Sequence, residues 1–206
     1  MKVILVNGSP HKEGCTYTAL CEVARTLNEE GIDTEIFNLA GEDIPGCRAC
    51  GACTKLGKCV IDDKVNQFVA KVAEADGFVF GSPVHYAAPS ALITSFMGRA
   101  FYSGKGAFAF KPAASVVSAR RAGTTAAFEQ INKFFTISQM PVISSRYWNM
   151  VHGSTPEDVL KDEEGMQVMR VLGRNMAWFL KLKEAGEKAG ITPPVQEPNK
   201  RTNFIR

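Results

Sequence analysis

The sequence predicts an α/β protein in which a parallel sheet lies between two layers of helices. Short apolar runs rich in β-branched residues alternate with longer segments whose apolar residues recur at helical spacing. Turn-forming residues follow several of these runs, so these strands are predicted to end in loops. Parallel strands joined by right-handed helical crossovers give a three-layer sandwich.

The N-terminal segment forms the first βαβ unit. Residues 2–6, KVILV, are predicted to be a buried strand, because Asn7-Gly8-Ser9-Pro10 cannot continue it. A helix follows and ends near Gly31, since apolar residues recur at helical spacing at Leu20, Val23, Ala24 and Leu27. Residues 34–39 are predicted to be the second strand.

The middle of the chain repeats this alternation. A helix is indicated by apolar residues at offsets 0, 3, 4, 7 and 8, namely Val65, Phe68, Val69, Val72 and Ala73. Asp62 or Asp63 can cap its start. Residues 77–81 are then predicted to be a third buried strand, and residues 90–102 a helix.

The C-terminal part supplies the rest of the sheet and a long helix. We expect a fourth strand at 113–118, a helix carrying Phe128, Ile131 and Phe135, and a shorter fifth strand at 141–144. A long terminal helix should start after Thr155-Pro156, a cap followed by proline at the first helical position. Its apolar face should pack on the sheet or on another subunit, and it comprises Met169, Leu172, Gly173, Met176 and Leu180.

Size and composition favour one domain. The 206 residues, 45% of them hydrophobic, suit a domain over residues 1–190 with a cysteine-rich insert at 46–60 and an irregular proline-containing tail at 191–206. The net charge is +3 and the basic residues are dispersed, so we expect no nucleic-acid partner. No apolar run approaches the ~20 residues that span a bilayer. The N-terminus resembles no secretion signal, so we expect a cytoplasmic protein with reduced thiols.

Four cysteines fall within the insert at the spacing C-x2-C-x2-C-x5-C. Thiolates at this density favour the ligands of one iron-sulfur cluster, here a 4Fe-4S cluster. Zinc is an alternative, although structural zinc sites usually place two ligand pairs further apart. A redox-active or vestigial thiol patch is another alternative. The candidate ligands are Cys47, Cys50, Cys53 and Cys59.

The loop after the first strand, residues 7–18, is suited to a phosphate. It combines small residues and hydroxyls with a following helix N-terminus, where unpaired N–H groups and the helix dipole favour an anion. Ser9, Thr16 and Thr18 can donate hydroxyl hydrogen bonds. The loop is neither a Walker loop nor GxGxxG. Its hydroxyls could instead merely cap the helix.

Two further loops at strand carboxyl ends belong to the same predicted site. Residues 82–86 supply backbone groups and the aromatic Tyr86, although SPVHY alone could be an ordinary strand-end turn. Residues 118–123 include small residues that let a flat ring approach the backbone, and Arg120 and Arg121 could stabilise a reduced anionic ring or a phosphate. Ligands of open parallel sheets bind at the strand carboxyl ends, so the three loops predict a mononucleotide site. The cysteine insert should lie on the same rim, because it follows the second strand.

Three segments occurring in this order resemble the NAD(P)H-dependent FMN reductases, in particular the iron-sulfur flavoproteins: Gly8–Thr18, the cysteine run with Val60–Asp63, and Asp76–Tyr86. The resemblance implies a flavodoxin-like fold, a five-stranded parallel sheet of order 2-1-3-4-5 and FMN as the ligand. The residues that would cradle the phosphate are Ser9, His11, Cys15, Thr16, Tyr17 and Thr18. Those that would hold the isoalloxazine ring are Pro83, Val84, His85 and Tyr86, with Ser118 and Gly123 on its other side.

Three positions depart from the commoner pattern of that family. His11 stands where arginine is frequent, so the charge facing the phosphate would depend on pH around the histidine pKa of ~6.5. Cys15, a thiol at a helix N-terminus, could have a lowered pKa or could simply be a small residue that fits the turn. His85 stands where tyrosine or an apolar residue is common.

The resemblance implies an FMN-dependent oxidoreductase. We expect it to take electrons from NAD(P)H or a ferredoxin-like donor and to pass them to a quinone, free flavin or dioxygen, with the cluster as a relay. One alternative is a non-enzymatic, flavodoxin-like electron carrier. Another is a metal-stabilised structural module with an empty nucleotide site. Because members of that family are usually dimers or tetramers, the resemblance also implies a homodimer or homotetramer.

Overall fold

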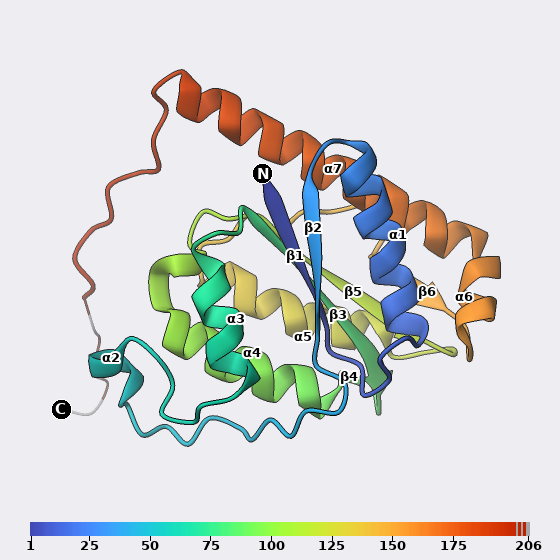
Figure 1. Cartoon of the computed structure of the whole chain (residues 1–206), viewed down its shortest axis with the longest axis horizontal. Coiled ribbons are helices and arrows are strands. Elements are labelled where there is room, and N and C mark those ends of the chain that lie inside the picture. The colour runs from blue at the N-terminus through green and yellow to red at the C-terminus, as the bar shows by residue number, and fades with distance from the viewer. Residues whose placement is uncertain (201, 203, 205–206) are drawn as a thin grey trace.

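A twisted parallel sheet forms the middle layer of the protein (Figure 1). The computed structural model describes residues 1–200, 202 and 204. Five parallel strands lie in the order β2-β1-β3-β5-β6, and a short strand, β4, pairs antiparallel with β3. Apart from β4, this is the predicted order 2-1-3-4-5. The strands are β1 Lys2–Asn7, β2 Asp33–Asn38, β3 Gly77–His85, β4 Ala88–Pro89, β5 Ala113–Ala119 and β6 Met150–His152.

Helices cover both faces of the sheet, which confirms the three-layer sandwich. One face packs against α1 (Cys15–Glu29), α6 (Pro156–Lys161) and α7 (Glu163–Lys188). The other face packs against α3 (Lys64–Val72), α4 (Ala91–Gly104) and α5 (Thr124–Ile137). A one-turn helix α2 (Cys53–Leu56) and a 3-10 helix η1 (Lys105–Phe108) lie outside these layers, beside the end of α4.

The helices begin where the sequence provides caps. Asp63 is the N-cap of α3, and its carboxylate accepts a hydrogen bond from Val65 N. Ser90 caps α4 in the same way, accepting from Ile93 N at 3.1 Å. Each cap satisfies a backbone donor that the first helical turn leaves unpaired. Both caps therefore fix helix starts next to loops of functional interest.

The fifth strand is not where the sequence suggested. Residues 141–144 make only an isolated bridge, between Ala113 and Val142, whereas the strand itself is β6 at Met150–His152. Pro141 has no N–H to donate, and the chain leaves the sheet before returning at Asn149, whose side chain donates to Ser115 O at 3.0 Å. A three-residue strand is too short to show an alternating pattern in sequence.

The predicted single C-terminal helix is two helices. Thr155 caps α6 through a capping box with Asp158, as its Thr-Pro start suggested. The chain then breaks at Asp162, whose carboxylate accepts from Gly165 N at 2.9 Å and starts α7. The predicted apolar face of α7 is buried against α1 and the sheet, and Gly173 allows close contact with Thr26.

Beyond α7 the described chain has no regular structure in residues 191–200. A hydrogen bond of 2.9 Å from Gln139 to Gln196 ties this segment to the body. Positions 201, 203, 205 and 206 of the predicted tail lie outside the described residues. Among the helices described here, we find none that is both long and apolar enough to cross a bilayer.

Candidate functional site

The loops after β1 and β3, at the carboxyl edge of the sheet, are bound directly to each other. Gly8 N donates to Gly81 O at 2.9 Å, and Ser90 Oγ donates to Gly8 O at 2.6 Å. Ser90 N in turn donates to Ser82 Oγ at 2.9 Å. A Cβ at Gly8 would come within 2.5 Å of Ile93, so only glycine fits here. These hydrogen bonds therefore fix the loops after β1 and β3 relative to each other.

Asn7 holds the shape of the first loop from inside. Its side-chain nitrogen donates to His11 O and Lys12 O at 3.3 and 3.2 Å, and its oxygen accepts from Ser9 N at 3.2 Å. The Ser9 hydroxyl accepts from His11 N at 3.1 Å. Ser9 is buried, whereas His11 is exposed at the tip of the loop. These turn-type side-chain bonds keep the loop compact ahead of α1.

The first turn of α1 has no side-chain cap. Gly14 is its N-cap residue and has no side chain to accept the orphan N–H groups of that turn. Thr18 Oγ1 instead donates to Gly14 O at 3.2 Å. The Thr16 hydroxyl lies 2.8 Å from that of Ser118, a buried contact that joins α1 to the end of β5. Tyr17 is half-buried.

Cys15 lies at the start of α1 but lacks the lowered pKa that this position could give. Burial is the main cause that raises the pKa of its thiol, and the carboxylates of Asp158 and Glu157 raise it further. Its sulfur lies 3.7 Å from Gly153 O. Of the two interpretations offered for Cys15, these contacts favour the packed residue that fits between two loops over a thiol with a lowered pKa.

The second loop is the turn of the β3–β4 hairpin. Tyr86 and Ala87 both have positive φ, +49° and +60°, as the central residues of a type I′ turn require. Such φ values are unfavourable for residues other than glycine and asparagine. Tyr86 and His85 are exposed, whereas Pro83 and Val84 are half-buried.

The third loop touches the tip of that hairpin. Gly123 has φ +90°, and a Cβ there would lie 2.8 Å from Ala87 Cα and 3.1 Å from Val84. The predicted flavin residues from all three loops are thus gathered at one edge of the sheet. Ser118 is buried beside Thr16, so its hydroxyl is already engaged within the protein.

The cysteine insert does not lie on this rim. After β2 the chain runs from the neighbourhood of β4 along the helices to α2, as Figure 1 shows. There Cys53 Sγ lies 3.7 Å from Tyr102 O, and Lys105 Nζ donates to Thr54 O at 2.8 Å. Tyr102 is about 18 Å from Ser90 along α4, at a rise of about 1.5 Å per residue. The expectation of a shared rim is therefore wrong, because the insert follows α4 to its far end.

The four cysteines of the insert line one cavity of about 660 Å³. Cys47 and Cys50 are exposed, while Cys53 and Cys59 are half-buried, and all are free thiols. Backbone Ala49 N donates to Cys47 Sγ at 3.4 Å. Within the residues that the structure describes, no three histidine, cysteine, aspartate or glutamate side chains are grouped closely enough to hold a metal ion.

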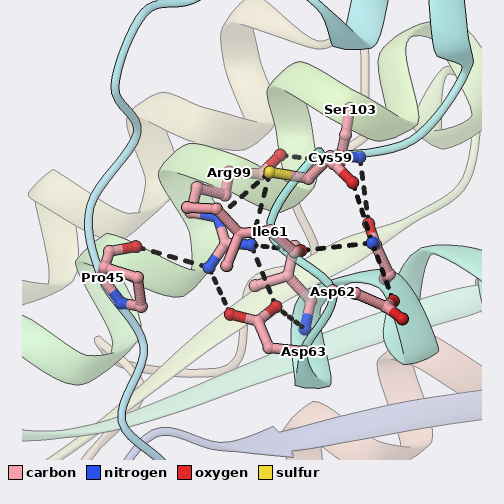
Figure 2. A network of polar contacts seen from close by, with 9 residues as sticks. Pro45, Cys59, Ile61, Asp62, Asp63, Arg99 and Ser103 are labelled. Carbon is pink, nitrogen blue, oxygen red and sulfur yellow. Dashed lines mark hydrogen bonds and ion pairs between the residues drawn. The ribbon is translucent and has the colours of Figure 1, made fainter.

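A buried arginine fixes the end of the insert (Figure 2). Arg99 of α4 donates to Cys59 Sγ from Nε at 3.4 Å and from Nη2 at 3.3 Å. It also forms an ion pair with Asp63 at 2.5 Å and donates to Ile61 O at 3.0 Å and Pro45 O at 3.4 Å. Burial lowers the pKa of Arg99, but Asp63 and Cys59 together raise it above its ordinary value.

Sequence reasoning missed Asn7, Ser90 and Arg99. Asn7 could have been found as an asparagine between a buried strand and a Gly-Ser-Pro turn. Ser90 had the signal of an N-cap after proline, ahead of an apolar helix. Arg99 was visible as the one charged residue in ALITSFMGRAFY, but only the fold shows that this cation faces inward.

Comparison with known proteins gives consistent results. A family model described as NADPH-dependent FMN reductase matches residues 1–155. An iron-sulfur flavoprotein of Methanocaldococcus jannaschii is 35% identical, over 88% of this chain and 98% of the relative. One from Methanosarcina thermophila is 29% identical, over 88% and 96%. A solved flavodoxin from the domain Archaea aligns with a TM-score of 0.62 at 15% identity, over 88% and 99% of the two chains, which confirms a flavodoxin-like fold.

Proposed function

The chain belongs to the NADPH-dependent FMN reductase family, and on this premise we propose that it is an FMN-dependent oxidoreductase. It takes electrons from NAD(P)H or from a ferredoxin-like donor and passes them to a small acceptor such as a quinone, a free flavin or dioxygen. The observation that carries the proposal is that three loops meet at the carboxyl edge of the sheet, where open α/β sheets bind their ligands: the first two are joined by hydrogen bonds at Gly8, and the third contacts them at Ser118 and Gly123.

The FMN phosphate is proposed to bind at the start of α1. The uncapped first turn leaves N–H donors for an anion, and the Asn7-braced loop keeps them together. His11 is exposed in this loop, and its imidazole is available to contact the phosphate. The residues proposed for the phosphate are Ser9, His11, Cys15, Thr16, Tyr17 and Thr18.

The isoalloxazine ring is proposed to lie against the β3–β4 hairpin. Tyr86 offers an exposed aromatic face, and Gly123 keeps the opposite loop within contact of Ala87. Bound FMN supplies hydride acceptance and can release electrons singly or in pairs. The residues proposed for the ring are Pro83, Val84, His85 and Tyr86, with Ser118 and Gly123 from the third loop.

Cys47, Cys50, Cys53 and Cys59 are proposed to hold a 4Fe-4S cluster. Support comes from the donor set, because four free thiols line one cavity and N–H groups already reach two of the sulfurs. Relatives of similar length are named iron-sulfur flavoproteins. The exposed Cys47 and Cys50 would have to draw in toward the other two thiols.

The proposal includes the cellular location and the oligomeric state of the protein. We place the protein in the cytoplasm, since its six cysteines, all within the described chain, form no disulfide. A homodimer or homotetramer is proposed from the family to which the chain belongs. Residues 1–190 are taken as one domain with the insert at 46–60, and 191–206 as a tail.

Anaerobic purification tests the two cofactors separately. The wild type should contain about one FMN per chain, and its spectrum should show flavin and iron-sulfur absorption. The triple variant Cys47→Ser/Cys50→Ser/Cys53→Ser should lose iron and keep FMN, because the flavin loops lie at the other end of α4. A colourless protein that binds no added FMN would contradict the proposal.

Turnover decides between an enzyme and a carrier. We expect steady-state oxidation of NADH or NADPH with a quinone or free flavin as acceptor. Negligible turnover combined with rapid reduction by a ferredoxin would instead favour the flavodoxin-like carrier. The NADH and NADPH arms are run in parallel with the triple cysteine variant as a matched control for the contribution of iron.

A further inference from the structure

The four cysteines of the insert differ in how firmly the protein holds them. Asn66 of α3 accepts from Cys59 N at 3.0 Å and donates to Cys59 O at 2.9 Å. Two N–H groups of Arg99 reach the Cys59 sulfur. Both main-chain groups and the side chain of Cys59 are therefore fixed by helices of the core, whereas Cys47 and Cys50 are exposed.

Arg99 is the centre of this arrangement. Its side chain is 1% exposed, and its guanidinium contacts the beginning of the insert at Pro45, its end at Cys59 and Ile61, and the cap of α3 at Asp63. Figure 2 shows the side chain pointing from α4 between these segments. One planar group thus closes the loop that contains all four cysteines. A lysine could not make these contacts, because it lacks the planar fork of five donors.

A buried guanidinium is costly unless it is paired, and the ion pair with Asp63 satisfies only part of it. The donors that remain are aimed at a sulfur and two carbonyls. Hydrogen bonds to a ligand sulfur and nearby positive charge are among the factors that set the potential of iron-sulfur groups. Groups around a metal ligand also orient it before the metal binds.

We propose that Arg99 is the positioning residue of the cysteine insert: it fixes the Cys59 sulfur before metal binds and raises the reduction potential of the group bound there. The first half rests on the contacts of Arg99 alone. The second half rests on the proposed function, since it requires the cluster. Cys59 is then the starting ligand, and the exposed cysteines close onto it.

The first measurement uses the metal-free full-length protein. Hydrogen exchange of the peptide covering residues 45–61 is followed in wild type, Arg99→Lys and Arg99→Met. We expect exchange to rise in Arg99→Lys and to rise further in Arg99→Met, because the two ends of the insert are released. Arg48→Met is the matched control, since Arg48 lines the same cavity but is exposed. Equal exchange in wild type and both Arg99 variants would overturn the first half.

The second measurement reconstitutes the same proteins with ferrous iron and sulfide under anaerobic conditions. Losing a residue that orients a metal ligand typically lowers metal affinity about 10- to 100-fold, so we expect Arg99→Met to lose iron while its FMN content stays at the wild-type level. The retained FMN shows that the variant is folded. Arg99→Met with wild-type iron affinity would overturn the positioning role.

The third measurement separates an effect on potential from a merely structural one. Asn66→Ala frees the Cys59 backbone but leaves the Arg99 donors on its sulfur, so it should increase exchange and leave the midpoint potential near that of wild type. Arg99→Lys should shift the potential to more negative values. Equal shifts in the two variants would contradict a direct effect of Arg99. If the wild type takes up no iron, the proposed cluster fails, and the exchange experiment still decides the first half.

Discussion

The two ends of α4 show two ways of building a site. At its start, Ser90 connects the loop after β1 to the end of β3 through main-chain and hydroxyl groups, and it caps α4 itself. At its far end, Arg99 holds the cysteine insert through one long side chain. The rim is a continuation of the sheet, whereas the insert is held at its two ends by Arg99 and in its middle by two contacts with the end of α4, and Cys47 and Cys50 are exposed.

The two regions differ in how far contacts within the protein alone fix their structure. The rim loops satisfy one another, so their positions follow from the fold itself. The exposed cysteines of the insert have few contacts with the core, and the buried ion pair between Arg99 and Asp63 is a main support of that region. At the insert, mutations of buried charged side chains should therefore cause large losses of stability. At the rim, mutations should act by changing the backbone positions of the loops.

The largest effect is expected from breaking the ion pair under the insert. Asp63→Ala leaves the Arg99 guanidinium buried without its carboxylate and removes the N-cap of α3. Stranding a buried charge costs about 3–5 kcal/mol of unfolding free energy. Urea unfolding measures the loss. Asp62→Ala, one residue earlier and exposed, should change stability by less than about 0.5 kcal/mol. Similar losses for the two variants would show that the pair is not a support of the insert.

The next effect tests backbone geometry at the rim. Gly123→Ala places a Cβ within 2.8 Å of Ala87 at a φ of +90°, which costs about 1–2 kcal/mol and pushes the third loop from the hairpin. FMN titration of the apoprotein should show weakened binding. Gly106→Ala is the control, because its Cβ meets no atom within 4 Å. Unchanged FMN affinity in Gly123→Ala would separate this contact from the flavin site.

A smaller effect concerns the cap that joins α4 to the first loop. Ser90→Ala removes the α4 cap and the hydrogen bond to Gly8 O, which should cost about 1–2 kcal/mol and lower FMN affinity. Thr155→Ala removes the α6 cap instead, so it should lower the thermal stability of the protein and leave its affinity for FMN unchanged. If both variants bound FMN as wild type does, Ser90 would be a helix cap and nothing more.

The smallest effect lies outside both regions and serves as a reference. The hydrogen bond from Arg25 lowers the pKa of Glu22, burial opposes this, and Arg170 of α7 lowers it further. Because the folded pKa is below the unfolded value of about 4.3, this stabilisation is present above that pH and is lost as pH falls through the folded pKa.

Glu22→Gln should therefore be less stable than wild type by at most about 1 kcal/mol at pH 7. The difference should shrink below about pH 4.3. Chemical unfolding at both pH values measures it, with the exposed Glu129→Gln as control. A difference that is constant with pH would mean that the ion pair between α1 and α7 is not responsible.

Much of the fold could be predicted because its signals are local. Buried strands such as residues 2–6 and helices with a periodic apolar face depend on nearby residues alone. The fifth strand could not, since residues 150–152 are a strand only through pairing with β5. The break at Asp162 was hidden because the apolar pattern of α7 begins after it.

The candidate site shows the same limit. The three loops could be assigned to one rim because parallel strands end at a common edge. The location of the insert could not be predicted in this way. Its position after β2 shows where the chain leaves the sheet but not how far from the sheet edge the cysteines lie. The role of Arg99 depends on side-chain contacts across 40 positions with Cys59, which no local pattern contains.

A single helix, α4, therefore carries residues of both candidate sites, so any coupling between their affinities would have to be reciprocal. Ser90 and Arg99 move together whenever α4 shifts as a body. If filling the cavity at one end changes the affinity at the other end by some factor, filling the other end must change the first by the same factor. The length of α4 separates the two candidate sites in space. Because the helix is stiff, a shift of the whole helix would displace residues of both sites together.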